Sequence, residues 1–190
     1  MDSTEIQDVK RIIRESEAVS GLETLGLGAS HARFLNLPFY QTGQVHKEEI
    51  GPADIAIVRG LLEEIGPQLV FVAGDLSDPH GTHRMCKEAI DRALEGLPGT
   101  RPEVWLYRGA WQEWPVTEAT WLVPLAQEEL RLKIQAIFKH QSQKDSAPFP
   151  GAHDEREFWQ RVEARNKETA AVLNRLGLAE YYAMEAYVVA

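Results

Sequence analysis

Short apolar runs alternate with amphipathic helical segments in the middle of this sequence, and this alternation constrains the fold most. A helix with an apolar face is predicted over 52–65, an apolar run follows at 69–73, a second helical segment ends at Leu94, and a second run covers 104–107. A short apolar run bounded by turn residues is typical of a strand buried in a parallel sheet. We therefore expect an α/β fold with a Rossmann-like, mostly parallel sheet and flanking helices.

The remaining elements follow from the same patterns. We expect a helix over 5–25, a strand over 32–37, a helix from about Glu128 to His140, a long helix over 158–176 and a last strand over 186–189. Glycines after the first and last of these helices are stop signals. Because no linker divides the chain, we expect a single domain over residues 1–190.

Composition excludes several classes of protein. The 29 acidic and 20 basic residues give a formal net charge of -9, which argues against nucleic acid as a partner, since nucleic-acid binding needs a basic surface. The first six residues lack the basic start and apolar stretch of a secretory signal, and no apolar run approaches roughly 18 residues, so we expect a soluble, cytoplasmic protein without a membrane partner. Cys86 is the only cysteine and cannot form an intrachain disulfide.

The segment 74–84 directly after the first apolar run carries the most chemistry. His80 and His83 are three residues apart, and Asp75 and Asp78 lie close by. Open α/β sheets bind ligands beyond the carboxyl ends of their strands, and a hydrolytic zinc site takes three protein ligands from histidine and carboxylate side chains. The alternative is that the aspartates solvate a loop or cap a helix and that the histidines are simply exposed.

Two other places offer weaker signals. Arg108 follows the second apolar run and is placed to hold an anionic group, although an arginine at a loop start needs no such role. Trp105, Trp111 and Trp114 flank the same strand end, where one of them could offer its ring face to a sugar while the others pack in the core. His140 lies at a helix end, where a structural role against free carbonyls is the default.

Three segments together resemble the PIG-L/LmbE-like family of zinc-dependent N-acetylglucosaminyl deacetylases. They are Phe-Leu-Asn-Leu-Pro-Phe at 34–39, Pro-Gln-Leu-Val-Phe-Val at 67–72 leading to His-Gly-Thr-His-Arg at 80–84, and His-Gln-Ser-Gln at 140–143. The stretch Trp-Leu-Tyr-Arg-Gly-Ala-Trp at 105–111 is similar to the form of the family that is fused behind a glucosamine-6-phosphate deaminase domain.

The resemblance implies a function and a set of roles. It implies a hydrolase that removes the N-acetyl group from a small-molecule amino sugar, with His83 as a zinc ligand and His80 assisting the tetrahedral intermediate. Asp78, Arg108, His140 and Gln143 are the expected substrate contacts. The family has Pro-Asp between the two histidines, whereas this chain has Gly81 and Thr82 and therefore lacks the family's aspartate.

The resemblance is incomplete at the amino end. The family's other two metal ligands and its general base come from an Ala-His-Pro-Asp-Asp-Glu loop after its first strand, and no such sequence occurs here. We therefore expect an N-terminally truncated domain that lacks its first strand, belongs to a longer protein with an upstream deaminase domain, binds zinc weakly and is inactive alone. Loss of a central strand leaves backbone groups unpaired, which predicts a chain that is unstable or self-associates.

Two alternatives belong to other classes. One is a non-catalytic module that binds a sugar phosphate and is attached to the deaminase; the change to Gly81 and Thr82 favours it slightly. The other is a structural domain that mediates homo-oligomerisation, for which the acidic surface and the long helix at 155–176 would suffice.

Overall fold

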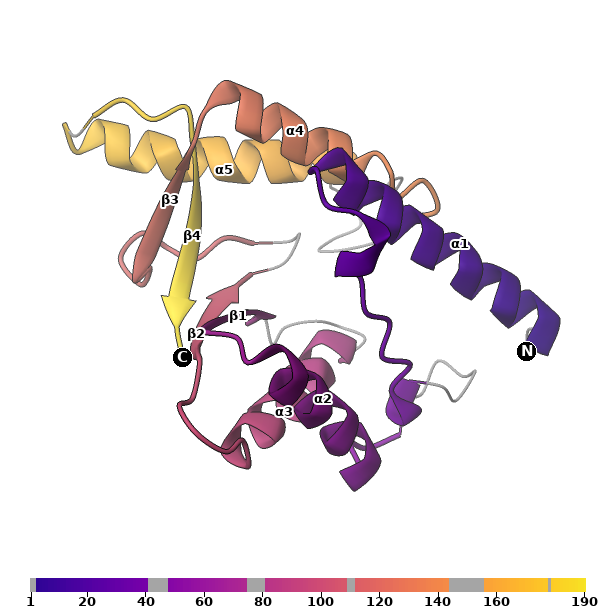
Figure 1. Cartoon of the computed structure of the whole chain (residues 1–190). Coiled ribbons are helices and arrows are strands. Elements are labelled where there is room, and N and C mark those ends of the chain that lie inside the picture. The colour runs from indigo at the N-terminus through magenta and orange to yellow at the C-terminus, as the bar shows by residue number, and fades with distance from the viewer. Residues whose placement is uncertain (1–2, 41–47, 75–80, 109–111, 144–155, 178) are drawn as a thin grey trace. The chain divides into compact units, whose positions relative to one another are not determined.

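The chain forms two compact units that both combine helices and strands (Figure 1). The computed structural model describes residues 3–40, 48–74, 81–108, 112–143, 156–177 and 179–190. Unit 1 comprises residues 1–2, 35–109 and 188–190, and unit 2 comprises residues 3–34 and 110–187. The predicted α/β class is confirmed. No helix in these described ranges is long and apolar enough to cross a membrane.

Unit 1 is built on the predicted strand–helix–strand segment. Helix α2 (Pro52–Ile65) precedes strand β1 (Leu69–Ala73), and helix α3 (Thr82–Glu95) connects it to strand β2 (Glu103–Tyr107). The two strands are parallel, with Leu69 paired with Glu103 and Ala73 paired with Tyr107. On the other side of β2, Val188 and Val189 pair with it in the antiparallel sense.

The core of unit 1 is apolar and lies between the sheet and its two helices. Alternate strand residues contribute to one face, where Val72 and Val104 are 3% and 5% exposed. On the opposite face Phe71 is 52% exposed and packs edge-on against Trp105 at 5.6 Å between ring centroids. The buried members of this core are Phe39, Ile50, Val58, Leu62, Val72, Ala89, Ala93, Leu94 and Val104.

The carboxylate of Asp54 fixes the start of α2. Its Oδ2 accepts a hydrogen bond from the Gly51 backbone N–H at 2.9 Å, and its Oδ1 accepts one from the Phe39 N–H at 3.0 Å. A buried carboxylate that satisfies two backbone donors stabilises both segments. Asp54 thereby holds the short 3₁₀ helix η2 (Pro38–Tyr40) against α2.

The prediction of a strand over residues 32–37 is wrong. A 3₁₀ helix, η1 (Ala29–His31), precedes this segment, and residues 32–37 form no strand. Asn36 has a φ of 48°, which is a left-handed conformation that interrupts the regular geometry of a strand. The apolar residues Leu35 and Leu37 instead pack against the core of unit 1.

Unit 2 contains a strand that the sequence patterns do not predict. Strand β3 (Trp121–Leu125) pairs antiparallel with β4 (Ala183–Val189), from Trp121 opposite Tyr187 to Leu125 opposite Ala183. Pro124 concealed β3 in the sequence, because proline lacks the backbone N–H that a strand interior needs. Proline is tolerated on a strand edge that has no neighbouring strand. Within the described residues β3 pairs with β4 alone. The expectation of a mostly parallel sheet therefore needs correction: one strand pair is parallel and two are antiparallel.

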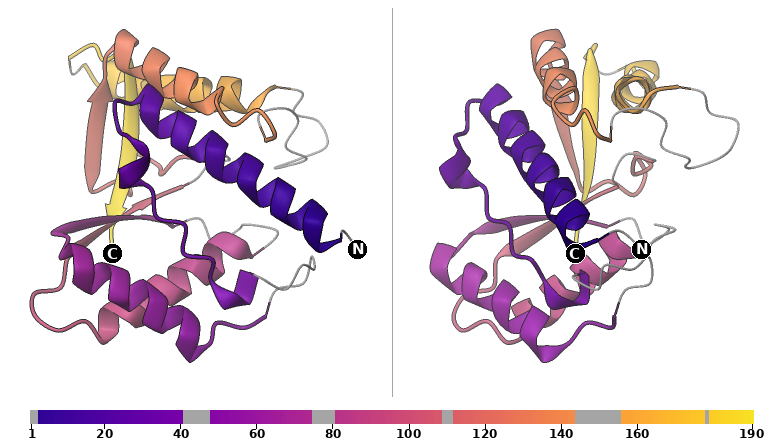
Figure 2. Two further views of the ribbon diagram at one scale, coloured as in Figure 1. Left: turned by 45° about the vertical axis from the view of Figure 1, so that its right-hand side comes forward. Right: turned by 90° about the vertical axis from the view of Figure 1, so that its right-hand side faces the viewer.

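Three helices complete unit 2. Helix α1 (Thr4–Thr24) packs along α4 (Gln127–Ile137), as both views of Figure 2 show, and α4 also contacts α5 (Phe158–Arg175). All three helices were predicted. Ala170 and Leu173 of α5 pack with Met184 of β4 in a small apolar cluster. Asn166, Thr169 and Arg161 are also buried here, at 0%, 6% and 6% exposure, so the interior of this unit is partly polar.

Candidate functional site

The segment that carries the predicted catalytic residues belongs to unit 1 and follows strand β1 in the sequence. Ala73 and Tyr107 are paired at the carboxyl ends of the two parallel strands, and the Gly74 N–H donates a hydrogen bond to the Tyr107 carbonyl at 2.7 Å. This is the edge at which open α/β sheets bind ligands. Arg108 follows β2 directly and is half-buried. Asp78 and His80 lie outside the described residues, so their roles stay predictions.

His83 lies in the first turn of α3, and its side chain is exposed. The residue before the helix, Gly81, has a φ of 68°, and a Cβ there would lie 3.0 Å from Nη2 of Arg84. Proline is fixed near a φ of −65° and cannot adopt this conformation. Where the deacetylase motif has proline, this chain therefore has a glycine in a backbone conformation that proline cannot adopt.

The described residues do not make up a zinc site. A hydrolytic zinc ion takes three protein ligands and leaves one position for water. His83 is the one described residue that the family motif assigns to the metal, and no group of three histidine, cysteine, aspartate or glutamate residues within the described ranges could hold a metal ion. Any complete metal centre needs ligands from outside the described set.

His140 and Gln143 lie in unit 2, just after α4. The imidazole of His140 covers Gly21 of α1, because a Cβ on that glycine would lie 3.1 Å from the ring Nε2. The Gln143 N–H donates to the His140 carbonyl at 3.0 Å, which forms a turn. In this turn the Ser142 N–H and hydroxyl both donate to the Glu17 carboxylate, at 2.7 and 2.6 Å.

These contacts lower the pKa of Glu17. Burial alone would raise its pKa, but the two hydrogen bonds from Ser142 and the charges of His140 and Arg14 outweigh it and hold the pKa below its usual value. The turn at 140–143 is thus tied to α1 by an ionised carboxylate. This structural role is the alternative that the sequence left open for His140.

A polar network that the sequence patterns do not reveal occupies the interior of unit 2. The Asn166 side chain accepts a hydrogen bond from Lys133 Nζ at 3.0 Å and donates to the Met184 carbonyl at 3.0 Å and to Glu113 Oε2 at 3.3 Å. Lys133 also forms an ion pair with Glu185, which accepts a hydrogen bond from the Tyr187 hydroxyl at 2.7 Å. The network joins α4, α5 and β4.

The two carboxylates of this network have opposite pKa shifts. Burial alone would raise the pKa of Glu185, but the charge and hydrogen bond of Lys133 outweigh it and hold the pKa below its usual value. Burial raises the pKa of Glu113, although the Arg165 charge acts in the opposite direction. Burial also raises the pKa of Tyr187, with Glu185 adding to the effect. Glu185 receives hydrogen bonds from Lys133 and Tyr187 in addition to the Lys133 charge, whereas at Glu113 burial outweighs the favourable charges and the backbone hydrogen bond.

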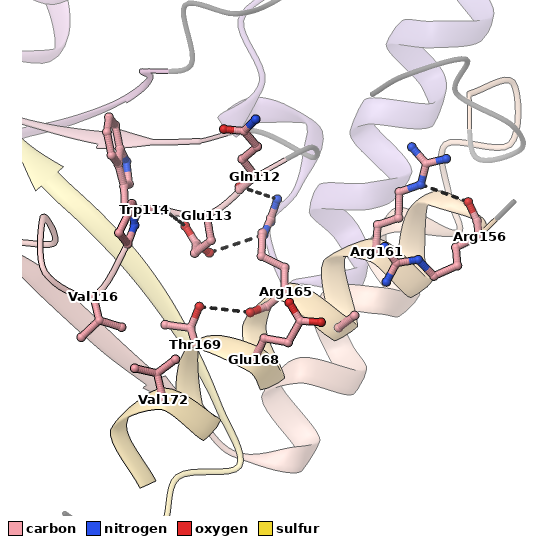
Figure 3. Close-up of a pocket in the computed structure, with 12 residues that line it drawn as sticks. Gln112, Glu113, Trp114, Val116, Arg156, Arg161, Arg165, Glu168, Thr169 and Val172 are labelled. Carbon is pink, nitrogen blue, oxygen red and sulfur yellow. Dashed lines mark hydrogen bonds and ion pairs between the residues drawn. The ribbon is translucent and has the colours of Figure 1, made fainter. Parts of the chain in front are cut away.

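A cavity of about 370 Å³ opens beside this network, between residues 112–116 and one face of α5. Figure 3 shows Arg165 directed from α5 toward Gln112 and Glu113, with Trp114 on the same side. Arg165 Nη1 donates to the Gln112 carbonyl at 3.2 Å, and its Nε lies 3.4 Å from Glu113 Oε2. The further lining residues are Pro115, Val116, Arg156, Arg161, Ala164, Glu168, Thr169 and Val172.

The placement of Trp114 after a strand was one sequence signal for this cavity. Trp114 lines the cavity, Trp105 packs against Phe71, and Trp111 lies outside the described residues. Arg161 and Arg165 are four residues apart on α5, a spacing that also fits a solvated helix face, and Arg156 precedes that helix, so the sequence does not mark these arginines as a group.

The predicted site residues divide between the units. His83 and Arg108 belong to unit 1, and His140 and Gln143 belong to unit 2. The expected substrate contacts thus belong to different units and stay predictions.

Comparison with known proteins shows that the chain corresponds to part of a longer relative. No family model matches it. It is 49% identical over 194 residues to a glucosamine-6-phosphate deaminase-like protein of Bacteroides thetaiotaomicron, and the match covers 99% of this chain. The chain spans 29% of the length of that relative.

Solved structures share the fold. The teicoplanin deacetylase Orf2, in a zinc-inhibited form, has a TM-score of 0.53 at 18% identity, over 94% of this chain and 74% of the deacetylase. GalB, the 4-carboxy-2-hydroxymuconate hydratase of Pseudomonas putida KT2440, has a TM-score of 0.61 at 14% identity, over 100% of this chain and 74% of the hydratase. These structures confirm the fold that the resemblance to the PIG-L/LmbE-like deacetylases implies, and the name of the relative contains the glucosamine-6-phosphate deaminase that the resemblance led us to expect.

Proposed function

We propose that the protein to which this chain belongs removes the N-acetyl group from an amino sugar by hydrolysis. The observation that supports the proposal is the position of His83 in the first turn of α3, the helix that lies between the parallel strands β1 and β2 in the sequence, in a fold that the teicoplanin deacetylase shares. The deaminase-like relative adds support for the substrate class, because its name refers to glucosamine 6-phosphate. The reaction breaks the amide C–N bond, and water supplies the oxygen of the acetate and the proton that the amine takes up.

The roles of individual residues follow the family motif. His80 donates a hydrogen bond to the carbonyl oxygen as negative charge develops on it, and His83 is a metal ligand. Asp78, Arg108, His140 and Gln143 contact the substrate. Because one assigned ligand cannot fix a coordination geometry, the chain alone binds zinc weakly and does not catalyse the reaction. The remaining ligands belong to residues that the structure does not describe or to other parts of a longer protein.

The wider setting forms part of the same proposal. A deaminase-type domain upstream agrees with a match that covers only 29% of the relative. We also propose a cytoplasmic location and a homo-oligomeric state for this protein. A second candidate is a non-catalytic module that binds a sugar phosphate, and the cavity of unit 2 favours it because arginines line that cavity.

An acetate-release assay tests the proposed function. The full-length Bacteroides relative and this chain are incubated separately with N-acetylglucosamine and its 6-phosphate, with zinc or with a chelator, and acetate and free amine are quantified. We expect equal amounts of acetate and amine from the relative, none after chelation, and none from this chain. Absence of acetate from the relative would contradict the deacetylase proposal and leave the binding module. Release by this chain alone would contradict the need for further ligands.

A further inference from the structure

The two halves of helix α1 are packed differently. In the carboxyl half, the Glu17 carboxylate accepts hydrogen bonds from the Ser142 N–H and hydroxyl at 2.7 and 2.6 Å, and His140 covers the buried Gly21. The amino half runs past the end of α4, as both views of Figure 2 show. The contacts that anchor α1 to α4 and to the turn after it thus lie in the carboxyl half of the helix.

The amino half of α1 carries an exposed apolar stripe, which consists of Ile6, Val9 and Ile13. These residues are spaced by three and four positions, which places them on one side of a helix, and they are 48%, 56% and 45% exposed. Steps of four residues from Ile13 lead to Glu17 and Gly21. The apolar stripe therefore continues the side of α1 that the turn after α4 covers farther along the helix.

Charged residues of the same half stabilise the helix from its other side. Arg11 forms ion pairs with Asp8 at 3.4 Å and with Glu15 at 3.3 Å. At the start of the helix the Ser3 hydroxyl accepts a hydrogen bond from the Ile6 N–H at 3.4 Å. A cap and helical ion pairs favour the helix before any partner is present. The apolar stripe is therefore presented on a preformed helix, which lowers the entropic cost of docking.

The small size of the apolar stripe indicates which kind of partner covers it. Stable interfaces between separate proteins usually bury at least roughly 1,000 Å², with about 20 residues on each side, and three side chains provide far less. A surface on the same polypeptide loses less translational and rotational entropy, because covalent linkage keeps its effective concentration high. This chain spans 29% of the length of its relative, so most of that longer polypeptide lies outside it.

We propose that the apolar stripe of α1 docks against an apolar surface of the deaminase-type part of the longer protein. The inference rests on the proposed function, in which this chain is joined to such a part. It makes α1 the docking helix between the two parts, and it uses none of the residues assigned to deacetylation.

Hydrogen exchange followed by mass spectrometry tests the docking without any measurement of acetate release, so its outcome is separate from that of the deacetylase proposal. The full-length Bacteroides relative is compared with this chain over the segment equivalent to residues 4–15, and the segment equivalent to 158–175 is the control. We expect the first segment to exchange at least about tenfold more slowly in the relative, because docking suppresses local opening of the helix end. The control segment should exchange similarly in both proteins.

Two results of this comparison would overturn the proposal. One is equal exchange of the first segment in both proteins. The other is slow exchange of that segment in this chain by itself, because the apolar stripe would then be covered within the chain or, if the effect depends on concentration, by a second copy. Photocrosslinking from the position of the relative equivalent to Val9 should reach the deaminase-type part, and crosslinks confined to the segment matched by this chain would also overturn the proposal.

Variants of the relative locate the contact on the helix. The change equivalent to Val9→Lys should speed exchange of the first segment about tenfold, since it places a charge in an apolar contact, whereas the change equivalent to Val9→Ile should have no effect. The change equivalent to Asp8→Lys, on the charged side of the helix, is the matched control without effect. In this chain Val9→Lys should leave exchange and circular dichroism unchanged, because the side chain is already 56% exposed. Equal effects of the two lysine changes in the relative would refute the docking surface.

Discussion

The two units of this chain are stabilised in different ways. The interior of unit 1 consists mainly of nine buried hydrophobic residues between two parallel strands and two helices, with Asp54 as a buried polar exception. Unit 2 buries a smaller apolar cluster together with Asn166, Thr169 and Arg161, and an Asn166-centred network connects its helices to β4. Unit 1 therefore depends on packing, whereas unit 2 depends on the pairing of polar groups. We therefore expect pH and isosteric substitutions to change the stability of unit 2 more than that of unit 1.

Removal of the largest buried side chain should have the largest effect, and it should be seen in unit 1. Phe39 is 1% exposed, and Phe39→Ala is expected to cost about 3 to 5 kcal/mol because it leaves a cavity. Hydrogen exchange followed by mass spectrometry reports each unit separately, so faster exchange is expected in α2 and α3. Ile57→Ala, at a side chain that is 37% exposed, is the control with little effect. Equal acceleration throughout unit 2 would contradict the distinction between the units.

Loss of the central amide of the network should have the next largest effect, in unit 2. Asn166→Ala leaves Lys133 and the Met184 carbonyl without this partner, which should cost about 2 to 3 kcal/mol. Urea denaturation measures this cost. Arg175→Ala, in the last turn of the same helix, should change stability by less than about 0.5 kcal/mol. If both variants unfold at the same urea concentration, the network is not what stabilises unit 2.

The opposite pKa shifts of two carboxylates predict opposite pH dependences. The pKa of Glu185 is lowered in the folded state, so its contribution is present above the unfolded pKa and is lost as pH falls through the folded pKa, below about 4.3. The pKa of Glu113 is raised, so its contribution is present below the unfolded pKa and is lost as pH rises above about 4.3.

Glutamine variants separate these contributions when stability is measured from about pH 3 to 8. Glu185→Gln should lower the free energy of unfolding at neutral pH by about 2 kcal/mol, which is less than for a fully buried pair. In this variant stability should also fall less steeply as the pH is lowered into the acid range. In Glu113→Gln, by contrast, stability should fall less steeply than in wild type as the pH rises above about 4.3. Identical changes in both curves would contradict the assigned shifts.

The smallest expected effects come from one substitution made in each unit. Gly60, inside α2, has no atom within 4 Å of the place that an alanine Cβ would take, whereas a Cβ on Gly21 of α1 would lie 3.1 Å from His140 Nε2. Gly60→Ala should stabilise by about 0.5 to 1 kcal/mol through helix propensity. At Gly21 the same gain is offset by displacement of His140, so thermal denaturation should show a smaller gain or a loss. Equal stabilisation at both sites would show that His140 does not pack tightly on α1.

Much of unit 1 could be predicted from the sequence because its elements have regular hydrophobic patterns. The run 69–73 coincides with β1, and the helical face from Ile55 to Ile65 lies within α2. The strand expected over 32–37 failed because an apolar run alone does not reveal a left-handed residue such as Asn36. In unit 2, Pro124 concealed β3, since proline within a run argues against a strand.

The candidate sites were predictable to different degrees. The histidine segment was found because motif spacing is a local property, and its position at the end of β1 follows from the strand itself. The cavity lined by Arg156, Arg161 and Arg165 was not found. It depends on the approach of residues 112–116 to α5, and single-sequence periodicity contains no information about such long-range contacts.

We propose that this chain contributes His83 to a metal centre whose other ligands lie outside the described residues. Calorimetric titration of zinc into the chain, into His83→Ala and into the control His31→Ala tests this claim most directly. We predict binding weaker than about 1 μM for the chain and for His31→Ala, and a further loss of affinity in His83→Ala, because a single imidazole cannot fix the coordination geometry. Tight stoichiometric binding that His83→Ala leaves unchanged would contradict the account.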